Sequence, residues 1–181
     1  MATAYSKIQR NFWETDEARE MTPEEKYFWM YLQTNANVNT LGCYAFRMRK
    51  AMDETGYNRE TLEKLLQRME QVLRILYDEG TKEVFLLHWA EGNWNKKTAT
   101  LRALAADLKE IQSKTLKETV KTLLLKNGIF TEEEVEKAEK TAPSAQERNE
   151  KEQRGTTGNK RSGEGEGEGE GEGEGEKIYT S

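Results

Sequence analysis

The chain has 181 residues, of which 35% are hydrophobic and 34% are charged, and its formal net charge is −5 at pH 7. This length provides for one ordinary core with appendages and excludes two large domains. Residues 1–130 carry 20 Lys and Arg against 18 Asp and Glu, whereas residues 131–181 carry 8 against 15. The acidic balance therefore comes from the C-terminal part, so it does not exclude a polyanionic partner.

Cysteine usage and hydropathy narrow the class of protein further. Cys43 is the only cysteine, which excludes an internal disulfide and a zinc site made of several cysteines, and we interpret it as a buried apolar thiol. Residues 1–13 lack the apolar segment of a signal peptide, and no run approaches the roughly 20 apolar residues that a membrane helix needs. We expect a soluble intracellular protein with no membrane partner.

The first clear helix start lies at Thr22, with Pro23 at the first helical position and Glu25 three residues after the cap. We expect this helix to run to about residue 33. Its aromatic residues fall at helical spacing, and we interpret them as core rather than as a platform for nucleobases.

A short strand is expected at residues 43–46, followed by a second helix with Met48, Ala51 and Met52 on its buried side. Gly56 is a candidate left-handed cap for the end of that helix, and Asn58 is a candidate cap for the start of the next one. One residue therefore separates the two helices, which predicts a tight helix-turn-helix.

A third helix is expected from about Arg59, and one of its faces is apolar. Its expected buried residues are Leu62, Leu65, Leu66, Met69 and Leu73. Segments 73–77 and 83–89 are rich in β-forming residues and bracket a polar turn, as in an antiparallel hairpin. The order helix, strand, helix, helix, hairpin is that of a winged helix-turn-helix domain, which we assign to residues 1–92 together with an N-terminal arm.

Residues 93–140 are expected to form a basic helical extension of two helices. Leu101, Leu104, Leu108 and Ile111 have helical spacing, and a capping box of Thr115 with Glu118 predicts the start of the second helix. Residues 95–126 hold eight Lys and Arg against three acids. Both a solvated helix face and a nucleic-acid-binding surface are consistent with this charge.

Residues 141–181 form a low-complexity segment, and residues 163–176 are a strict alternation of glycine and glutamate. Such a composition buries too little apolar surface to offset the entropy of ordering. The predicted fold is therefore mainly α with a small β-hairpin, that is, a winged helix-turn-helix followed by two additional helices and a disordered acidic tail.

Several separated blocks resemble one protein family. They are FWETDEAREMTPEEKYFWMYLQTN, LGCYAF, ETGYN, and a hairpin that ends in LLHW with NWN after it. At these blocks the chain resembles the N-terminal domain of phage replisome organisers, which are related to DnaD-like primosome proteins. The resemblance covers roughly residues 7–124. In the segment EQVLRI the chain departs from the family's polar turn with glycine, which predicts that the third helix runs on toward the strand.

The resemblance implies a winged-helix domain that acts in the initiation of phage or plasmid DNA replication. Its expected partner is DNA, with a replicative helicase or helicase loader as a further partner and a homo-oligomer as a further state. The expected location is the cytoplasm or nucleoid of a bacterial host. In DnaD-like proteins the same domain can instead mediate self-association.

In a winged helix, one helix enters the major groove while lysine and arginine hold the phosphates. We interpret Arg47, Arg49 and Lys50 at the start of the second helix, together with Lys82 in the wing, as phosphate contacts. The groove-facing candidates on the third helix are Arg59, Lys64, Gln67 and Arg68. Glu60 and Glu63 share that face, so the helix has a balanced charge that would also serve a protein interface.

The sequence lacks the residue sets of familiar catalytic sites. His88 is the only histidine, and we interpret it as a structural residue on an apolar strand, which excludes a histidine triad or a site with several histidines. No phosphate-binding glycine loop is present, since the glycines of the repeat alternate with glutamate. We expect no enzyme activity, no cofactor and no metal. The alternatives to an initiator are an assembly module with weak or no DNA binding, and a phage transcription regulator.

Overall fold

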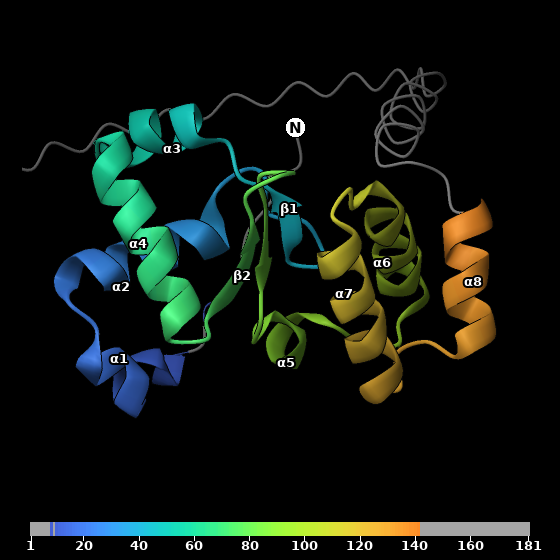
Figure 1. The fold of residues 1–181 in the computed structure, drawn as a ribbon. Coiled ribbons are helices and arrows are strands. Elements are labelled where there is room, and N and C mark those ends of the chain that lie inside the picture. The colour runs from blue at the N-terminus through green and yellow to red at the C-terminus, as the bar shows by residue number, and fades with distance from the viewer. Residues whose placement is uncertain (1–7, 9, 142–181) are drawn as a thin grey trace, which may run out of the picture.

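The protein is described as a computed structural model of residue 8 and residues 10–141. Its elements, in chain order, are η1 (Arg10–Glu14), α1 (Asp16–Glu20), α2 (Pro23–Thr34), β1 (Cys43–Ala45), α3 (Met48–Thr55), α4 (Arg59–Gln71), β2 (Ile75–Asp78), β3 (Glu83–Leu86), α5 (Trp89–Asn93), α6 (Thr98–Glu110), α7 (Lys114–Lys126) and α8 (Glu132–Thr141). The described chain is mainly helical with a small antiparallel sheet (Figure 1). The predicted tail lies outside the described residues, except for Thr141 at the end of α8.

The expected start of α2 is confirmed. The side chain of Thr22 accepts a hydrogen bond from the backbone N–H of Glu25, whose carboxylate accepts one from the N–H of Thr22 at 2.8 Å. This reciprocal pair satisfies two backbone donors that the first turn leaves without a partner. Phe28 and Leu32 are fully buried as expected, whereas Tyr27 is 47% exposed, so only part of the aromatic face of α2 packs in the core.

The tight turn between α3 and α4 is also confirmed. Gly56 has φ 77°, the left-handed conformation that ends α3, and the side chain of Asn58 accepts a hydrogen bond from the N–H of Thr61. Glycine adopts this conformation without the steric cost that a side chain would bring. Ala51 is buried on α3 as expected, while Met48 and Met52 are half-buried.

The sheet has three strands in the order β1-β3-β2, so the expected strand at residues 43–46 joins the hairpin. Every residue of the central strand β3 is buried. Figure 1 shows α1 to α4 on one side of the sheet, α6 to α8 on the other, and α5 at the lower end of the strands. Cys43 on β1 is 2% exposed, and this burial raises the pKa of its thiol well above the usual range.

The C-terminal end of α4 differs from the prediction. The helix ends at Gln71 and does not run on toward the strand, because Leu73 has φ 53° and reverses the chain. The N–H of Arg74 then donates to the carbonyl of Met69 at 2.9 Å. Leu73 is 67% exposed, so its assignment to the buried face was wrong. The helical spacing of the apolar residues on α4 led to the inclusion of Leu73, although the helix has ended and the backbone turns at that residue.

The second strand of the hairpin is shorter than predicted. β3 ends at Leu86, and Trp89 begins the short helix α5. The indole N–H of Trp89 donates to the carbonyl of Thr40 at 3.0 Å, and its ring lies against Gly42, where a Cβ would be 2.4 Å from Trp89 Cγ. His88 precedes α5 and its side chain is 53% exposed. Its placement on an apolar strand was therefore wrong.

The capping box predicted for α7 is wrong as well. The cap is Ser113, whose hydroxyl accepts a hydrogen bond from the N–H of Leu116. Thr115 is the second residue of the helix. The buried carboxylate of Glu83 accepts from the N–H groups of Gln112 and Ser113, the latter at 2.7 Å. A strand carboxylate therefore binds the positive end of α7, a partner that sequence spacing does not reveal.

Helices absent from the prediction complete the described chain. η1 and α1 form within the expected N-terminal arm, and α8 follows α7 and packs against α6. Val135 and Ala138 on α8, and Phe130 just before it, are each less than a tenth exposed, so this segment contributes to the core. The prediction of only two additional helices was therefore incomplete.

Candidate nucleic-acid interface

The first turn of α3 carries an unusual charge. Arg47 occupies the N-cap position without forming a side-chain cap, and the first turn contains no acidic residue. Arg49 follows it, and both side chains are exposed. Within the described part of the chain neither arginine forms an ion pair. Cations at this end oppose the helix dipole, whereas a bound anion would satisfy both the cations and the open backbone donors.

Lys50 is less available than the two arginines. Its side chain is 35% exposed, and its ammonium lies 3.7 Å from the Glu54 carboxylate and 3.5 Å from Asn37 Oδ1. Lys50 was expected to be largely exposed, and its side chain is instead only partly exposed. Among the three candidates on α3, Arg47 and Arg49 provide the larger unbalanced charge.

The β2–β3 turn adds Lys82 beside this helix start. The backbone carbonyl of Lys82 accepts a hydrogen bond from the N–H of Phe46 at 2.7 Å, so the turn and the residue before Arg47 are in direct contact. Lys82 has φ 57°, a conformation that favours glycine or asparagine. Its ammonium is exposed and lies 3.5 Å from the Glu79 carboxylate. The structure thus brings together the candidates of α3 and the turn.

The exposed face of α4 is nearly neutral. Arg59 pairs with Glu63 at 3.4 Å, and Lys64 pairs with Glu60 at 2.7 Å, each one helical turn away. The pKa of Glu60 is lowered because it accepts a hydrogen bond from Lys64 and lies close to its positive charge. Gln67 is exposed on the same helix. These residues share an accessible face, but two of its cations are already matched by acids.

Arg68 serves the architecture of the domain. Its Nε donates to Glu25 Oε1 at 2.9 Å, and the Glu25 side chain is only 10% exposed. Because Glu25 also closes the capping box of α2, this contact ties α4 to the start of α2. Arg68 is therefore less suited to groove contact than the sequence prediction assumed.

The cations of the basic extension are distributed over the two ends of the α6–α7 pair. Lys117 Nζ lies 3.5 Å from the carbonyl of Lys109 at one end. At the other end Lys96 lies near Gly128, since its Nζ is 3.9 Å from the Cβ position of that glycine. Lys121 is largely buried beside Glu118. These contacts place Lys117 and Lys96 at opposite ends of the α6–α7 pair.

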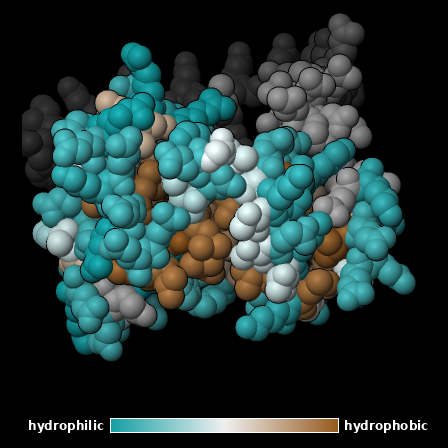
Figure 2. Space-filling model, in the orientation of Figure 1, coloured by the Kyte–Doolittle hydropathy of each residue, from teal (hydrophilic) through white to brown (hydrophobic). Residues whose placement is uncertain are grey.

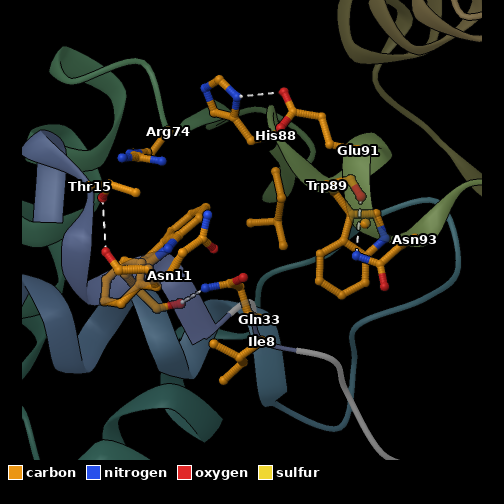
Figure 3. A pocket seen from close by; sticks show the side chains of 13 residues that line it. Ile8, Asn11, Thr15, Gln33, Arg74, His88, Trp89, Glu91 and Asn93 are labelled. Atoms are coloured by element: carbon orange, nitrogen blue, oxygen red, sulfur yellow. Dashed lines mark hydrogen bonds and ion pairs between the residues drawn. The ribbon is translucent and has the colours of Figure 1, made fainter.

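A separate pocket of about 400 Å³ lies where η1, α2 and α5 meet (Figure 3). Phe12, Trp29 and Trp89 contribute to its walls, and the guanidinium of Arg74 lies 5.6 Å from the centroid of the Trp29 ring. None of its lining residues belongs to α3 or to the β2–β3 turn. No sequence motif predicted it, because its walls come from four distant segments.

No helix in residues 10–141 is long and apolar enough to span a membrane. In the same part of the chain, no group of three or more His, Cys, Asp or Glu side chains is placed to hold a metal ion.

Comparison of the chain with protein-family models, with curated proteins and with solved structures found no match.

Proposed function

We propose that this chain is a DNA-binding replication initiation protein of the phage replisome-organiser type. In this proposal it contacts DNA through a winged helix and helps to assemble the helicase-loading complex, with a replicative helicase or its loader as protein partner. It acts in the cytoplasm or nucleoid of a bacterial host, and it is not an enzyme.

The order of elements supports the winged-helix part of this proposal. A helix (α2), a strand (β1), two helices joined by a tight turn (α3 and α4) and a hairpin (β2–β3) follow one another, and β1 pairs with the hairpin in one sheet. In such domains the second helix of the turn lies in the major groove and the hairpin lies beside it on the backbone. α4 would then be the groove helix, with Arg59, Lys64 and Gln67 facing the bases.

The observation that carries the proposal is the unbalanced positive charge at the start of α3. Arg47 and Arg49 stand at an uncapped helix N-terminus with no acid in its first turn, beside Lys82 of the β2–β3 turn. Duplex DNA presents a row of phosphates along each strand, so the start of α3 and the neighbouring β2–β3 turn can together hold phosphates beside the groove that α4 enters.

The test replaces both arginines, giving Arg47→Ala/Arg49→Ala. Loss of two phosphate contacts should weaken duplex binding and reduce the slope of log K against log salt concentration by about 2, since each contact contributes about 0.9. Fluorescence anisotropy with labelled duplex across a salt series measures both quantities. Circular dichroism checks folding, which should be unaffected because both side chains are exposed.

The matched control is Arg19→Ala/Lys140→Ala. It removes the same charge from exposed side chains on α1 and α8, which are 66% and 73% exposed. An equal loss of affinity in both variants would show that net charge alone sets binding, and unchanged affinity in the α3 variant would refute the proposed contact.

A second candidate function is supported by the charge pairing on α4 and by the exposure of Leu73. A neutral helix face and an apolar side chain that is 67% exposed suit a protein interface. Figure 2 shows hydrophobic residues gathered between α4 and α7, where β2 lies in Figure 1. In this alternative the chain is an oligomerisation or helicase-docking module with weak or no DNA binding.

Salt separates the two functions. Binding through phosphates weakens steeply as salt rises, whereas association through apolar side chains does not. Light scattering of the full chain across the same salt series, with and without duplex, therefore distinguishes a DNA-binding protein from a salt-insensitive oligomer. A phage transcription regulator would give the same result as an initiator, because both bind DNA with one fold.

A further inference from the structure

We propose that the pocket between η1, α2 and α5 binds an unpaired nucleotide, so that the protein has a single-strand site separate from the α3 surface. This inference rests on the proposed nucleic-acid function and extends it to a second kind of strand. We call this cavity the amide pocket, after the side chains of Asn11, Gln33 and Asn93 that line it.

The amides of the pocket have hydrogen-bonding capacity to spare. Gln33 Nε2 donates to the carbonyl of Trp29 at 3.4 Å, and Asn93 Nδ2 donates to the carbonyl of Trp89 at 3.1 Å. Within the described residues, these bonds do not use the side-chain oxygens of Gln33 and Asn93, which are still able to accept hydrogen bonds. The side-chain amide of Asn11 can likewise both donate to a ligand and accept from one. Carboxamides match the mixed donor and acceptor edge of a nucleobase.

The remaining walls suit the other parts of a nucleotide. Phe12, Trp29 and Trp89 also line the hollow, and since each is less than a tenth exposed, each offers a planar base only a small part of its ring. Figure 3 shows Arg74 and His88 on one side of the hollow, with Asn11 and Gln33 on the opposite side and Trp89 and Asn93 beside them. A base held by the amides would thus direct its phosphate toward Arg74 and His88.

Glu91 lies beside His88 in the pocket lining, and its negative charge would oppose a phosphate bound there. Its Oε1 lies 3.4 Å from Nδ1 of His88, so it also orients the imidazole. A phosphate is therefore expected nearer to Arg74, whose planar guanidinium lies over the Trp29 ring.

The chemistry of the lining favours a nucleotide over other ligands. An aliphatic or aromatic side chain of a protein partner would cover the spare amide oxygens without satisfying them, which costs binding energy. An inorganic anion would use Arg74 but none of the aromatic walls. The volume of about 400 Å³ lies in the range of small-molecule sites. A base stacked in a duplex cannot enter such a recess, so the ligand is an unpaired nucleotide.

A second stacking surface lies next to the pocket. The ring of Trp13 is 62% exposed and meets the ring of Phe12 edge to face, with 5.1 Å between centroids. A base that follows the bound nucleotide along a single strand can stack on this exposed indole. The site therefore fits a short single strand better than an isolated nucleotide.

The test follows the indole N–H signals of the four tryptophans by NMR in the full chain. The probes are deoxyadenosine monophosphate and a short single-stranded oligonucleotide. Saturable shifts of Trp29 and Trp89 with unchanged Trp94, which does not line the pocket, would support the site, and the oligonucleotide should also shift Trp13. Absence of saturable shifts at Trp29 and Trp89 would overturn the inference, whether or not the protein binds duplex.

Two variants and a control locate the effect. Asn11→Ala/His88→Ala changes two exposed residues and should weaken nucleotide binding about tenfold by removing hydrogen bonds. His88→Glu, at a side chain that is 53% exposed, places a carboxylate at the rim and should weaken it further. Gln71→Ala removes an exposed amide outside the amide pocket and should change nothing. Equal affinity in all of them would refute the assignment.

The α3 variant Arg47→Ala/Arg49→Ala separates this inference from the proposed function. It should lose duplex affinity while keeping the Trp29 and Trp89 shifts with deoxyadenosine monophosphate. Duplex binding that depends on the arginines, together with no nucleotide response, would leave the proposed function standing and remove the amide pocket from it.

Discussion

At the scale of single residues, two glycines share one backbone conformation but meet different surroundings. Gly42 has φ 76° and Gly56 has φ 77°. A Cβ added at Gly42 would lie 2.4 Å from Trp89 Cγ, whereas one added at Gly56 would meet nothing within 4 Å. Gly42 is therefore required by both conformation and packing, and Gly56 by conformation alone.

This difference predicts unequal effects of one substitution. Gly42→Ala should lower the free energy of unfolding by at least about 2 kcal/mol, because backbone strain adds to displacement of the Trp89 ring. Gly56→Ala should cost about 1 kcal/mol through strain alone. Urea unfolding followed by circular dichroism measures both. Equal losses would mean that the indole moves aside without cost.

At the scale of elements, helix starts show what local sequence can and cannot specify. The capping box of α2 lies within four consecutive residues, and the sequence identified it correctly. The start of α7 depends instead on Ser113, on Asp78 from β2 and on Glu83 from β3. Thr115 with Glu118 matched the spacing of a box, but the strand residues stabilise a start two residues earlier.

Two substitutions test this assignment. Ser113→Ala removes the acceptor for the Leu116 N–H and should lower the free energy of unfolding by about 1 kcal/mol. Thr115→Ala, at an exposed position inside the helix, should leave it within a few tenths of a kcal/mol. Chemical unfolding of both variants in parallel decides the matter. A greater loss in Thr115→Ala would restore the predicted cap.

The same contact gives a pH signature. The Ser113 hydroxyl, followed by the N–H of Thr81, lowers the pKa of Asp78, so the pKa should rise in Ser113→Ala. A lowered folded-state pKa stabilises the fold above the ordinary pKa, and this contribution is lost as the pH falls through the lowered value. The stability difference between the two proteins should therefore narrow in acid, which unfolding measured across a pH series would check.

At the scale of the whole molecule, the sheet is the layer that joins both parts of the chain. The buried carboxylate of Asp107 on α6 accepts from the N–H of Thr40 before β1, and that of Glu83 accepts from the start of α7. Buried hydrophobic residues from Phe12 to Ala138 form one core. Contacts of this kind cross the expected boundary at residue 92, so the α6–α8 segment supports the sheet that positions α3 and its cations.

The acidic C-terminal segment gives a prediction at this scale. Residues 163–176 contain seven glutamates and no cation, so if the chain binds DNA as proposed, they should compete with phosphates for exposed lysine and arginine. Deleting residues 142–181, which lie outside the described residues, should tighten nonspecific duplex binding while leaving the melting temperature unchanged. Anisotropy at low salt and thermal unfolding measure the two effects. A lower melting temperature would show that this segment packs on the domain.

The sequence by itself determined the features that depend on neighbouring residues. It predicted the capping box of α2, the turn at Gly56 and Asn58, the apolar faces of α4 and α6, and the burial of Cys43, because these follow from spacing and local hydrogen bonds. It also identified Arg47, Arg49 and Lys82 as candidate phosphate contacts, but it did not show that the start of α3 and the β2–β3 turn lie side by side.

Tertiary structure decided what depends on distant segments. The contact between Lys82 and the residue before Arg47, the ion pair that engages Arg68 with Glu25, and the exposed position of Leu73 all follow from how the sheet and helices pack. The amide pocket likewise exists only where η1, α2 and α5 meet. Periodicity records which side of an element is apolar, but the partners of a side chain are set by long-range contacts that no local pattern contains.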